Sequence, residues 1–145
     1  MLMGQVKNVK VIEMPEMLSV MEAEKGTIKV VNFWATWCKP CIKELPYFTK
    51  AAEEFPAVEF IFISLDFSDQ LKKVEAFSKK KGLTAGKRYL IDDVDYNAWI
   101  DKVSTSWSGA IPATVIVTTK EKKFYEKEFH QGELEALIKS TLKNN

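Results

Sequence analysis

The chain contains two cysteines, and both lie in the short segment Trp37-Cys38-Lys39-Pro40-Cys41. A spacing of three residues on the first turn of a helix brings two sulfurs to one side, within reach of a disulfide. The free N–H groups and the positive dipole end of a helix start favour a thiolate at Cys38. Because a thiolate is the attacking species in thiol–disulfide exchange, we expect Cys38 to be the nucleophile. Cys41, one turn deeper, is expected to resolve the mixed disulfide.

Two cysteines at this spacing also occur in metal sites and in protein cores. A structural zinc site needs about four ligands, and the chain adds a single histidine, His130, in a polar segment far along the sequence. The flanking Trp37, Lys39 and Pro40 indicate an exposed turn rather than a core. The pattern therefore favours a redox pair that needs no metal or other cofactor. A non-catalytic copper-binding module that uses the two cysteines and a third ligand is the alternative from a different class.

The neighbouring elements are expected to place the cysteines where a strand ends and a helix begins. Residues 28–34 and 58–65 are rich in β-branched and aromatic residues with little alternation, which is typical of central strands covered on both faces. Between them, apolar residues recur at steps of three and four from Ile42 to Phe55, which predicts a long helix. This order predicts a βαβ unit with parallel strands and a right-handed connection.

Shorter elements are predicted in the rest of the chain from apolar periodicity and from capping residues. They are an amphipathic helix over 15–21 with Gly26 just past its end, a helix over 71–81 that ends at Gly82, a helix over 96–103 with Asp93 and Asp95 as capping candidates, strands over 113–118 and 123–129, and a closing helix over 134–142. Two antiparallel strands and a helix therefore follow the βαβ half.

Size and composition limit the classes of protein to consider. The chain has 145 residues, with 46% hydrophobic residues, 28% charged residues and a formal net charge of +1. These values predict one folded domain over residues 1–145 and exclude a disordered chain or a disulfide scaffold. The near-zero charge supplies no field for holding nucleic acid or an anionic membrane. No apolar run approaches the roughly 20 residues of a membrane-spanning helix, so we expect neither a nucleic-acid partner nor a membrane span in this chain.

Two segments of the chain resemble a known family. Residues 32–46, Asn-Phe-Trp-Ala-Thr-Trp-Cys-Lys-Pro-Cys-Ile-Lys-Glu-Leu-Pro, resemble the active-site segment of thioredoxin-like proteins. Their W-C-x-P-C-x-x-E-x-P form is similar to that of the TlpA/ResA-like thiol–disulfide oxidoreductases of bacterial cell envelopes. Residues 109–114, Gly-Ala-Ile-Pro-Ala-Thr, resemble the loop of this family that ends in a cis proline.

The resemblance implies a fold. It is the thioredoxin-like α/β fold, in which helices flank a central mixed β-sheet. Residues 1–26 are consistent with the N-terminal extension of a strand and a helix that the family carries. The chain between Phe67 and Gly109 is longer than a minimal thioredoxin needs, which is typical of the insertion in the TlpA-like branch.

The resemblance also implies how a substrate is held. A cis proline at Pro112 places the backbone of Ile111 beside Cys38, where its N–H and C=O pair with an extended substrate segment. Trp37 resembles the tryptophan that shields the cysteines and offers apolar contact to a partner. Lys39 and Pro40, between the cysteines, are expected to tune the reduction potential, with a small effect of the exposed and screened Lys39 charge.

Proton transfer is assigned to Glu44. This residue lies three positions after Cys41 on the predicted helix, so its carboxylate can point near the resolving sulfur and take its proton. That role requires partial burial and a raised pKa for Glu44. The alternative is a solvated helix carboxylate paired with a nearby lysine. Asn32 stands where ordinary thioredoxins keep a buried aspartate, which moves the duty of general base to Glu44 or to solvent.

These roles together predict a protein-disulfide reductase, acting as a monomer with a protein disulfide as substrate and an upstream thiol as electron donor. By resemblance it works on the periplasmic or cell-envelope side, with any signal or anchor absent from this chain, and a cytoplasmic location stays open. The second enzyme hypothesis is a peroxiredoxin-like thiol peroxidase. Such a site usually needs a threonine and an arginine around the thiolate, and the chain offers Thr36 and a distant Arg88.

Other residues with possible chemistry are expected to be structural. His130 has no nearby acid or nucleophile in the sequence and is interpreted as a surface residue. The lysines of the second predicted helix are interpreted as a solvated face. Trp34 and Trp99 are expected in the core, while Tyr96 and Trp107 are candidates for a partner-binding surface near the active loop.

Overall fold

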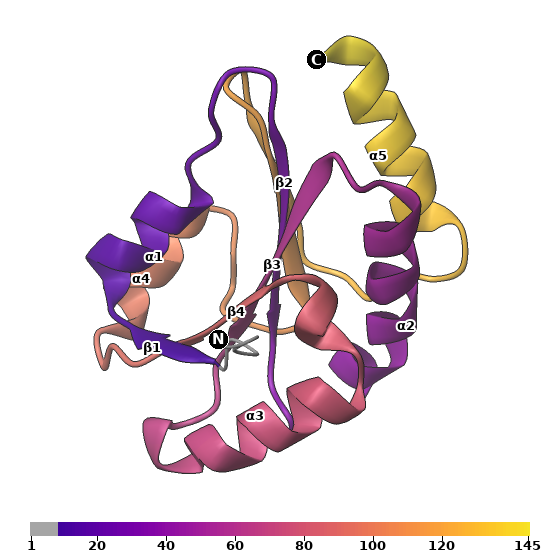
Figure 1. Ribbon diagram of the computed structural model, residues 1–145. Helices are drawn as coiled ribbons and strands as arrows, with labels where there is room; N and C mark the ends of the chain where they lie inside the picture. Colours follow the sequence, from indigo (N-terminus) through magenta and orange to yellow (C-terminus); the bar gives the residue numbers. More distant parts are fainter. Residues whose placement is uncertain (1–8) are drawn as a thin grey trace, which may run out of the picture.

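The computed structural model describes residues 9–145, which build a single six-stranded sheet with helices on both faces (Figure 1). The order of the strands across the sheet is β1-β4-β3-β2-β5-β6. Their bounds are β1 Lys10–Ile12, β2 Ile28–Trp34, β3 Val58–Ser64, β4 Lys87–Ile91, β5 Ala113–Val117 and β6 Lys122–Tyr125. The helices are α1 Met14–Met21, α2 Lys39–Glu54, α3 Leu71–Lys80, α4 Tyr96–Val103 and α5 Glu133–Asn144.

The sheet is mixed, as the resemblance implies. β1, β4, β3 and β2 run parallel, whereas β5 lies antiparallel to β2 and β6 lies antiparallel to β5. The long helix α2 connects the parallel pair β2 and β3, which confirms the predicted βαβ unit. Since Trp34 of β2 pairs with Ser64 of β3, and Ser64 pairs with Leu90 of β4, the carboxyl ends of three neighbouring strands lie level at one edge of the sheet.

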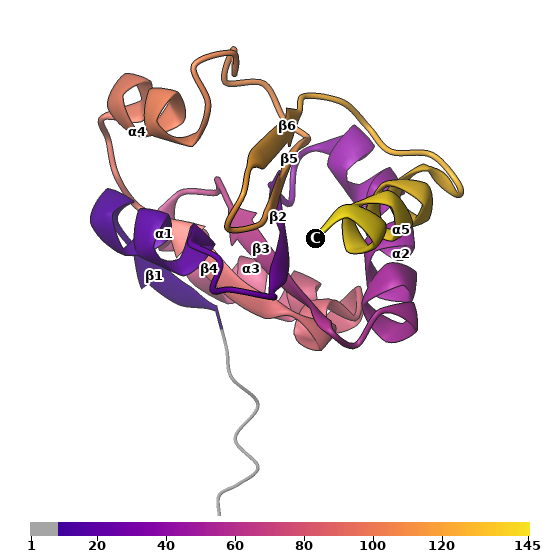
Figure 2. The same cartoon turned by 90° about the horizontal axis from the view of Figure 1, so that it is seen from above.

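Helices cover the two faces of the sheet unequally (Figure 2). Helices α2, α3 and α5 pack over one face and α1 and α4 over the other, and each layer encloses its own apolar cluster. Successive residues of a strand point to opposite faces, so Val30 and Trp34 of β2 enter the first cluster while Val31 and Phe33 enter the second. Burial on both faces explains the continuous apolar runs of β2 and β3.

Some boundaries differ from the sequence prediction. Strand β4 was not predicted, because its Lys-Arg-Tyr-Leu-Ile sequence has only a short apolar end. It lies between β3 and β1, so part of the expected insertion enters the sheet beside the N-terminal strand. Helix α1 ends at Met21, well before Gly26. Strand β6 ends at Tyr125, and Phe129, predicted as its last residue, is fully buried in the loop before α5.

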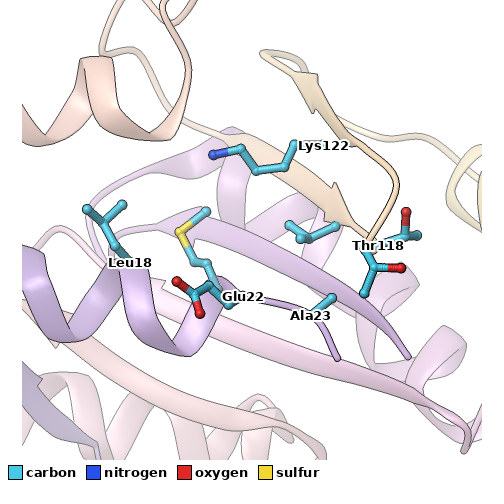
Figure 3. Close-up of a pocket in the computed structure, with 8 residues that line it drawn as sticks. Leu18, Glu22, Ala23, Thr118 and Lys122 are labelled. Carbon is cyan, nitrogen blue, oxygen red and sulfur yellow. The ribbon is translucent and has the colours of Figure 1, made fainter. Parts of the chain in front are cut away.

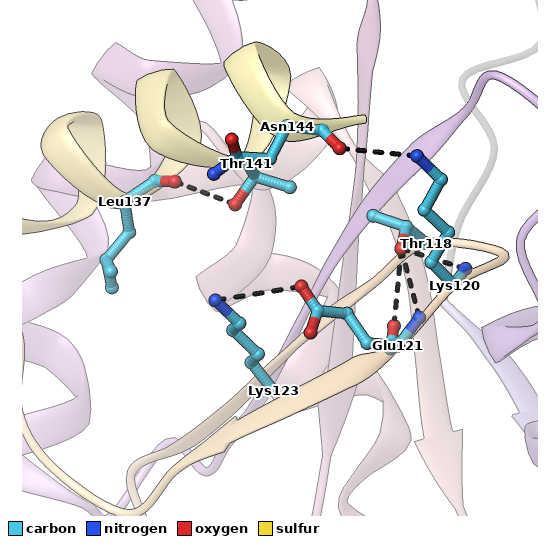
Figure 4. A network of polar contacts seen from close by, with 7 residues as sticks. All are labelled: Thr118, Lys120, Glu121, Lys123, Leu137, Thr141 and Asn144. Carbon is cyan, nitrogen blue, oxygen red and sulfur yellow. Dashed lines mark hydrogen bonds and ion pairs between the residues drawn. The ribbon is translucent and has the colours of Figure 1, made fainter.

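The edge of the sheet opposite the cysteines is closed by the turn between β5 and β6 (Figure 4). The hydroxyl oxygen of Thr118 accepts hydrogen bonds from the backbone N–H groups of Lys120 and Glu121, both at 3.2 Å. The ammonium group of Lys120 donates to the carbonyl oxygen of Asn144 at 3.4 Å, which ties the end of α5 to this turn. The C-terminal end of α5 therefore lies far from the strand ends that carry the cysteines.

An open depression of about 340 Å³ lies at the same end, between α1 and the β5–β6 hairpin (Figure 3). Leu18, Glu22 and Ala23 line it on one side and Thr118 and Lys122 on the other. It does not include either cysteine. Within residues 9–145, no helix combines the length and the apolar character needed to cross a membrane.

Candidate active site

The two cysteines lie at the junction of β2 and α2. After β2 ends at Trp34, a tight turn follows in which the Cys38 N–H donates to the carbonyl oxygen of Ala35 at 3.2 Å. Cys38 then caps α2, because its sulfur accepts a hydrogen bond from the Cys41 N–H at 3.3 Å. Pro40 fits the first turn of the helix, where a backbone N–H has no partner within the helix. The two sulfurs form a disulfide, with a Cα to Cα distance of 5.3 Å.

The two sulfurs differ in their access to solvent. Cys41 is fully buried, whereas Cys38 keeps 5% of its surface exposed. The flanking Trp37 is 64% exposed, and Lys39 and Pro40 are exposed as well. Cys38 is therefore the more accessible cysteine of the disulfide. The predicted exposed turn is present, although the cysteine itself lies just beneath its surface.

The loop before β5 closes the other side of the disulfide. The Ile111–Pro112 peptide bond is cis, as expected from the sequence. Ala113, the next residue, pairs with Phe33 of β2, which brings this loop level with the turn that carries the cysteines. The carbonyl oxygen of Ile111 lies 3.8 Å from the sulfur of Cys38. A backbone acceptor thus stands directly beside the more accessible sulfur.

Hydrogen bonds fix the shape of this loop. The indole N–H of Trp107 donates to the carbonyl oxygen of Ala110 at 2.8 Å. The carboxylate of Glu126, just after β6, accepts from the backbone N–H of Ser108 at 2.8 Å and from its hydroxyl at 2.6 Å. The loop is therefore anchored on both sides of Gly109, whose φ of +99° suits a glycine. Sequence reasoning did not foresee the contribution of Glu126.

Glu44 is fully buried beneath the cysteines on the inner face of α2. Its carboxylate accepts hydrogen bonds from the side-chain amide of Asn32 at 2.8 Å and from the backbone N–H of Phe129 at 2.9 Å. Burial raises the pKa of Glu44 from 4.5 to about 7, although both hydrogen bonds favour the charged form. These findings exclude the solvated carboxylate that the sequence left open. They meet the two requirements for a proton acceptor, burial and a raised pKa.

Asn32 is also fully buried, on β2. Its amide nitrogen donates to Glu44 and, at 3.2 Å, to the hydroxyl of Thr114 on β5, while its amide oxygen has no hydrogen-bond partner. A rotation of the amide by half a turn would place that oxygen next to Glu44 and Thr114 instead. Asn32 can therefore donate to an ionised Glu44 and accept from a protonated one.

A second buried carboxylate, Asp66, supports the turn before Cys38. It follows β3 and accepts hydrogen bonds from the Thr36 backbone N–H at 3.0 Å, the Thr36 hydroxyl at 2.6 Å and the Ser64 hydroxyl at 2.6 Å. Because β2 and β3 end side by side, Asp66 joins the two strand ends. The sequence signal was a polar residue directly after a buried parallel strand, and its role was not recognised.

The remaining candidates lie outside this site. Thr36, considered for a peroxidase, lies in the turn before Cys38, but its hydroxyl donates a hydrogen bond to Asp66. Arg88 is the second residue of β4 and pairs with Phe62 of β3, two residues before the pair Ser64 and Leu90 at the carboxyl ends. His130 is exposed on the surface, as expected. Within residues 9–145, no group of three or more histidine, cysteine, aspartate and glutamate side chains is arranged to hold a metal ion.

The tryptophans fall into two classes. Trp34, Trp99 and Trp107 are buried, so Trp107 does not form the surface considered for it. The ring of Trp107 packs between Phe33 and Phe124, with centroids 4.8 Å and 5.8 Å away. Trp37 alone among them is exposed, at the mouth of the site.

The chain matches the model of the AhpC/TSA family over residues 8–122. It belongs to the AhpC/TSA family. Among curated relatives of this family member, the thiol-disulfide oxidoreductase ResA of Bacillus cereus is 30% identical over 107 residues, which are 71% of this chain and 55% of that protein. The thioredoxin-like protein YneN of Bacillus subtilis is 36% identical over 83 residues, which are 55% of this chain and 47% of that protein. These relatives agree with the TlpA/ResA-like branch implied by the motif, and the chain spans about half the length of either.

Solved structures support the thioredoxin-like fold of this AhpC/TSA family member. A thioredoxin-related protein from Neisseria meningitidis serogroup B has a TM-score of 0.66 at 24% identity, covering 84% of this chain and 89% of that chain. A secreted disulfide oxidoreductase of Mycobacterium tuberculosis, homologous to Escherichia coli DsbE, has a TM-score of 0.63 at 23% identity, covering 80% and 83%. At these identities the likeness concerns the fold alone.

Proposed function

We propose that this protein is a thiol–disulfide oxidoreductase that reduces disulfides in partner proteins. The observation that carries the proposal is the asymmetric pair at the start of α2. One cysteine, Cys38, keeps 5% of its surface exposed and has its sulfur beside the Ile111 carbonyl, and the other, Cys41, is fully buried. Such a pair suits an attack by one sulfur and a release by the other.

Each reaction cycle transfers two electrons from the cysteine pair to the substrate disulfide. In the reduced protein, the thiolate of Cys38 attacks one sulfur of the substrate disulfide, which forms a mixed disulfide and releases the other substrate sulfur as a thiolate. Cys41 then loses its proton and attacks the sulfur of Cys38, which frees the substrate as a dithiol and leaves the Cys38–Cys41 disulfide of the structure. An upstream dithiol donor returns two electrons and restores the starting state.

The substrate is expected to lie along the cis-proline loop. The half-buried Ile111 offers its backbone N–H and C=O to an extended substrate segment, as a strand adds to a sheet edge. Pro112 holds this backbone at the end of β5, and the exposed indole of Trp37 contacts the substrate from the opposite side. Lys39 and Pro40, both exposed between the cysteines, tune the potential of the pair.

Glu44 is proposed to accept the proton that Cys41 loses. Its pKa of about 7 lets it exist in both protonation states near neutral pH. Asn32 supports both states, since its amide can present either a donor or an acceptor to the carboxyl group. Thr114, which lies against the same amide, can hold the rotated form.

The cellular setting is also part of the proposal. We propose a monomer that forms one thioredoxin-like domain over residues 1–145 and acts on the periplasmic or cell-envelope side. The support is that one structural relative is described as a secreted disulfide oxidoreductase and one sequence relative as ResA. A thiol peroxidase has less support, because Arg88 pairs with Phe62 within the sheet and the Thr36 hydroxyl binds Asp66. A copper-binding module has less support, because no group of three or more metal-ligating side chains is present within residues 9–145.

The test is the dithiothreitol-dependent reduction of insulin, followed by turbidity. The Cys38→Ser variant is expected to lose this activity, and the Cys41→Ser variant to stop as a mixed disulfide with the substrate. Retention of insulin reduction by Cys38→Ser would refute the assignment. Peroxide consumption by the reduced protein, or a stoichiometric metal after aerobic purification, would favour one of the alternatives.

A further inference from the structure

A row of exposed apolar side chains continues outward from the active site. Within residues 9–145, six large apolar side chains are exposed, and three of them, Trp37, Phe67 and Val94, are 64%, 71% and 91% exposed. Each follows a different strand of the parallel part of the sheet, namely β2, β3 and β4. We call these three residues the exposed apolar row. Because the three residues follow neighbouring strands, beginning with the strand that leads into the active-site turn, we consider them together as a candidate interaction site.

The strand register places the strand ends from which the three residues follow on one level. Trp37 comes three residues after Trp34, and Phe67 comes three residues after Ser64, the pairing partner of Trp34. Val94 follows Leu90, the partner of Ser64, by four residues. Neighbouring strands lie about 4.8 Å apart, so the ends of β2 and β4, from which Trp37 and Val94 follow, lie roughly 10 Å apart.

Phe67 stands in the middle of the row for a structural reason. The preceding residue, Asp66, points inward and binds Thr36 and Ser64. Since Asp66 is fixed inward and the chain turns directly into the short helical segment Ser68–Gln70, the Phe67 side chain is turned outward. The hydrogen bonds of Asp66 thus also tie the backbone of Phe67 to the Thr36 turn next to Cys38.

The charge around the row changes along its length. Lys39 lies at the inner end, beside Cys38, and the exposed Lys72 and Lys73 follow Phe67 by five and six residues, in the first turn of α3. The outer end has the sequence Asp92-Asp93-Val94-Asp95, in which Asp92 and Asp95 are exposed and no basic residue intervenes. The carboxylate of Asp93 is occupied by the backbone N–H groups of Met14 and Asp95. The outer end is therefore acidic around an exposed valine.

From this arrangement we infer that the row is the docking surface for one class of substrate. The inference rests on the proposed function and names its partner: a protein whose disulfide is followed, within a few residues of extended chain, by an apolar side chain and then by a lysine or arginine. The apolar group packs on Phe67, and the basic group faces the exposed carboxylates of Asp92 and Asp95, which flank Val94 in the sequence. An extended chain advances about 3.3 Å per residue, so roughly three residues span the 10 Å between the ends of β2 and β4.

Binding to the oxidised protein tests this surface separately from redox activity. Oxidised protein and a disulfide peptide contain no thiolate, so they bind without exchange, and the fluorescence of Trp37 next to the site reports the complex. Four synthetic peptides closed by a disulfide are the probes. On both sides of the disulfide, each peptide has an inner position that is leucine or serine and an outer position that is lysine or glutamate. The four combinations of these two choices give the four peptides.

We expect the peptide with leucine and lysine to bind at least about fivefold more tightly than the one with serine and glutamate, because buried aromatic contacts and complementary charges commonly contribute this much. Phe67→Ser should reduce the preference for leucine to less than about twofold. Asp92→Asn should weaken the preference for lysine, and about 0.5 M salt should remove that preference. Leu142→Ser, which changes an exposed leucine at the far end of α5, is the matched control and should leave both preferences intact.

Equal binding of the four peptides, or an unchanged leucine preference in Phe67→Ser, would overturn the inference. So would an absence of measurable binding to all four peptides. None of these results tests the proposed function, because that function is tested by insulin reduction in the wild type and in Cys38→Ser. Conversely, if the insulin test refuted the proposed function while the binding preferences were retained, the docking surface would stand and the assignment as a reductase would fail.

Discussion

The buried carboxylate of Glu44 predicts an unusual dependence of stability on pH. Raising its pKa from 4.5 to about 7 makes the ionised form about 3 kcal/mol less favourable in the folded protein than in the unfolded chain. Below pH 4.5 the group is protonated in both states, and the folded protein has its full stability. As the pH rises from 4.5 to about 7, the unfolded chain ionises first, so this stability is lost progressively.

The Glu44→Gln variant isolates this effect. Glutamine is neutral at every pH, keeps one acceptor oxygen for the Phe129 N–H, and can donate to the amide oxygen of a rotated Asn32. The free energy of unfolding of the variant, relative to wild type, should therefore increase by about 3 kcal/mol between pH 4 and pH 8.5. Other titrating groups occur in both proteins and cancel in the difference.

Guanidinium unfolding of the oxidised proteins at several pH values measures this difference. The oxidised state is used because its cysteines do not titrate. Glu53→Gln, which removes an exposed carboxylate from the same helix, is the control and should show a difference that stays flat with pH. A difference between wild type and Glu44→Gln that varies by less than about 0.5 kcal/mol over this range would refute the burial argument.

Three further predictions concern the support and tuning of the site. Asp66→Asn should lower the free energy of unfolding by about 2–3 kcal/mol, because the buried Thr36 and Ser64 donors lose a charged acceptor; a loss below about 0.5 kcal/mol in denaturant unfolding would contradict this. Gly86→Ala should cost about 1–3 kcal/mol in the same assay, since a Cβ at this position would lie 2.7 Å from the Phe60 carbonyl oxygen; unchanged stability would show that the strand shifts freely. Lys39→Gln should slow the reaction of the reduced protein with iodoacetamide by less than about threefold at low salt and not at all at high salt. A tenfold effect would contradict the small contribution that we assign to the Lys39 charge.

The sequence predicted those parts of the fold that have strong local patterns. The apolar runs of β2 and β3, the periodicity of α2 and the position of the cysteines at its start were all evident, because buried parallel strands and amphipathic helices have clear signatures. The cis bond before Pro112 was predicted only through the family resemblance. Strand β4 was missed since its burial comes from pairing with β1 and β3 rather than from its own composition.

The partners of the buried polar groups were harder to predict. The spacing after Cys41 placed Glu44 near the resolving sulfur but left its burial open. Its bond to the Phe129 N–H joins residues 85 positions apart and depends on the path of the loop before α5. Asp66 and Glu126 likewise act across the fold, through contacts that no local pattern encodes. Long-range contacts of this kind follow from the packing of the whole sheet.

The order in which the two sulfurs react is most directly tested by trapping. The reduced single variants Cys41→Ser and Cys38→Ser are each mixed with an oxidised protein substrate such as insulin, and any mixed disulfide is mapped by mass spectrometry. The different exposures of the sulfurs predict that Cys41→Ser captures insulin through Cys38, while Cys38→Ser captures little or none. Equal capture by Cys41 in the Cys38→Ser variant would contradict the assignment of Cys38 as the attacking residue.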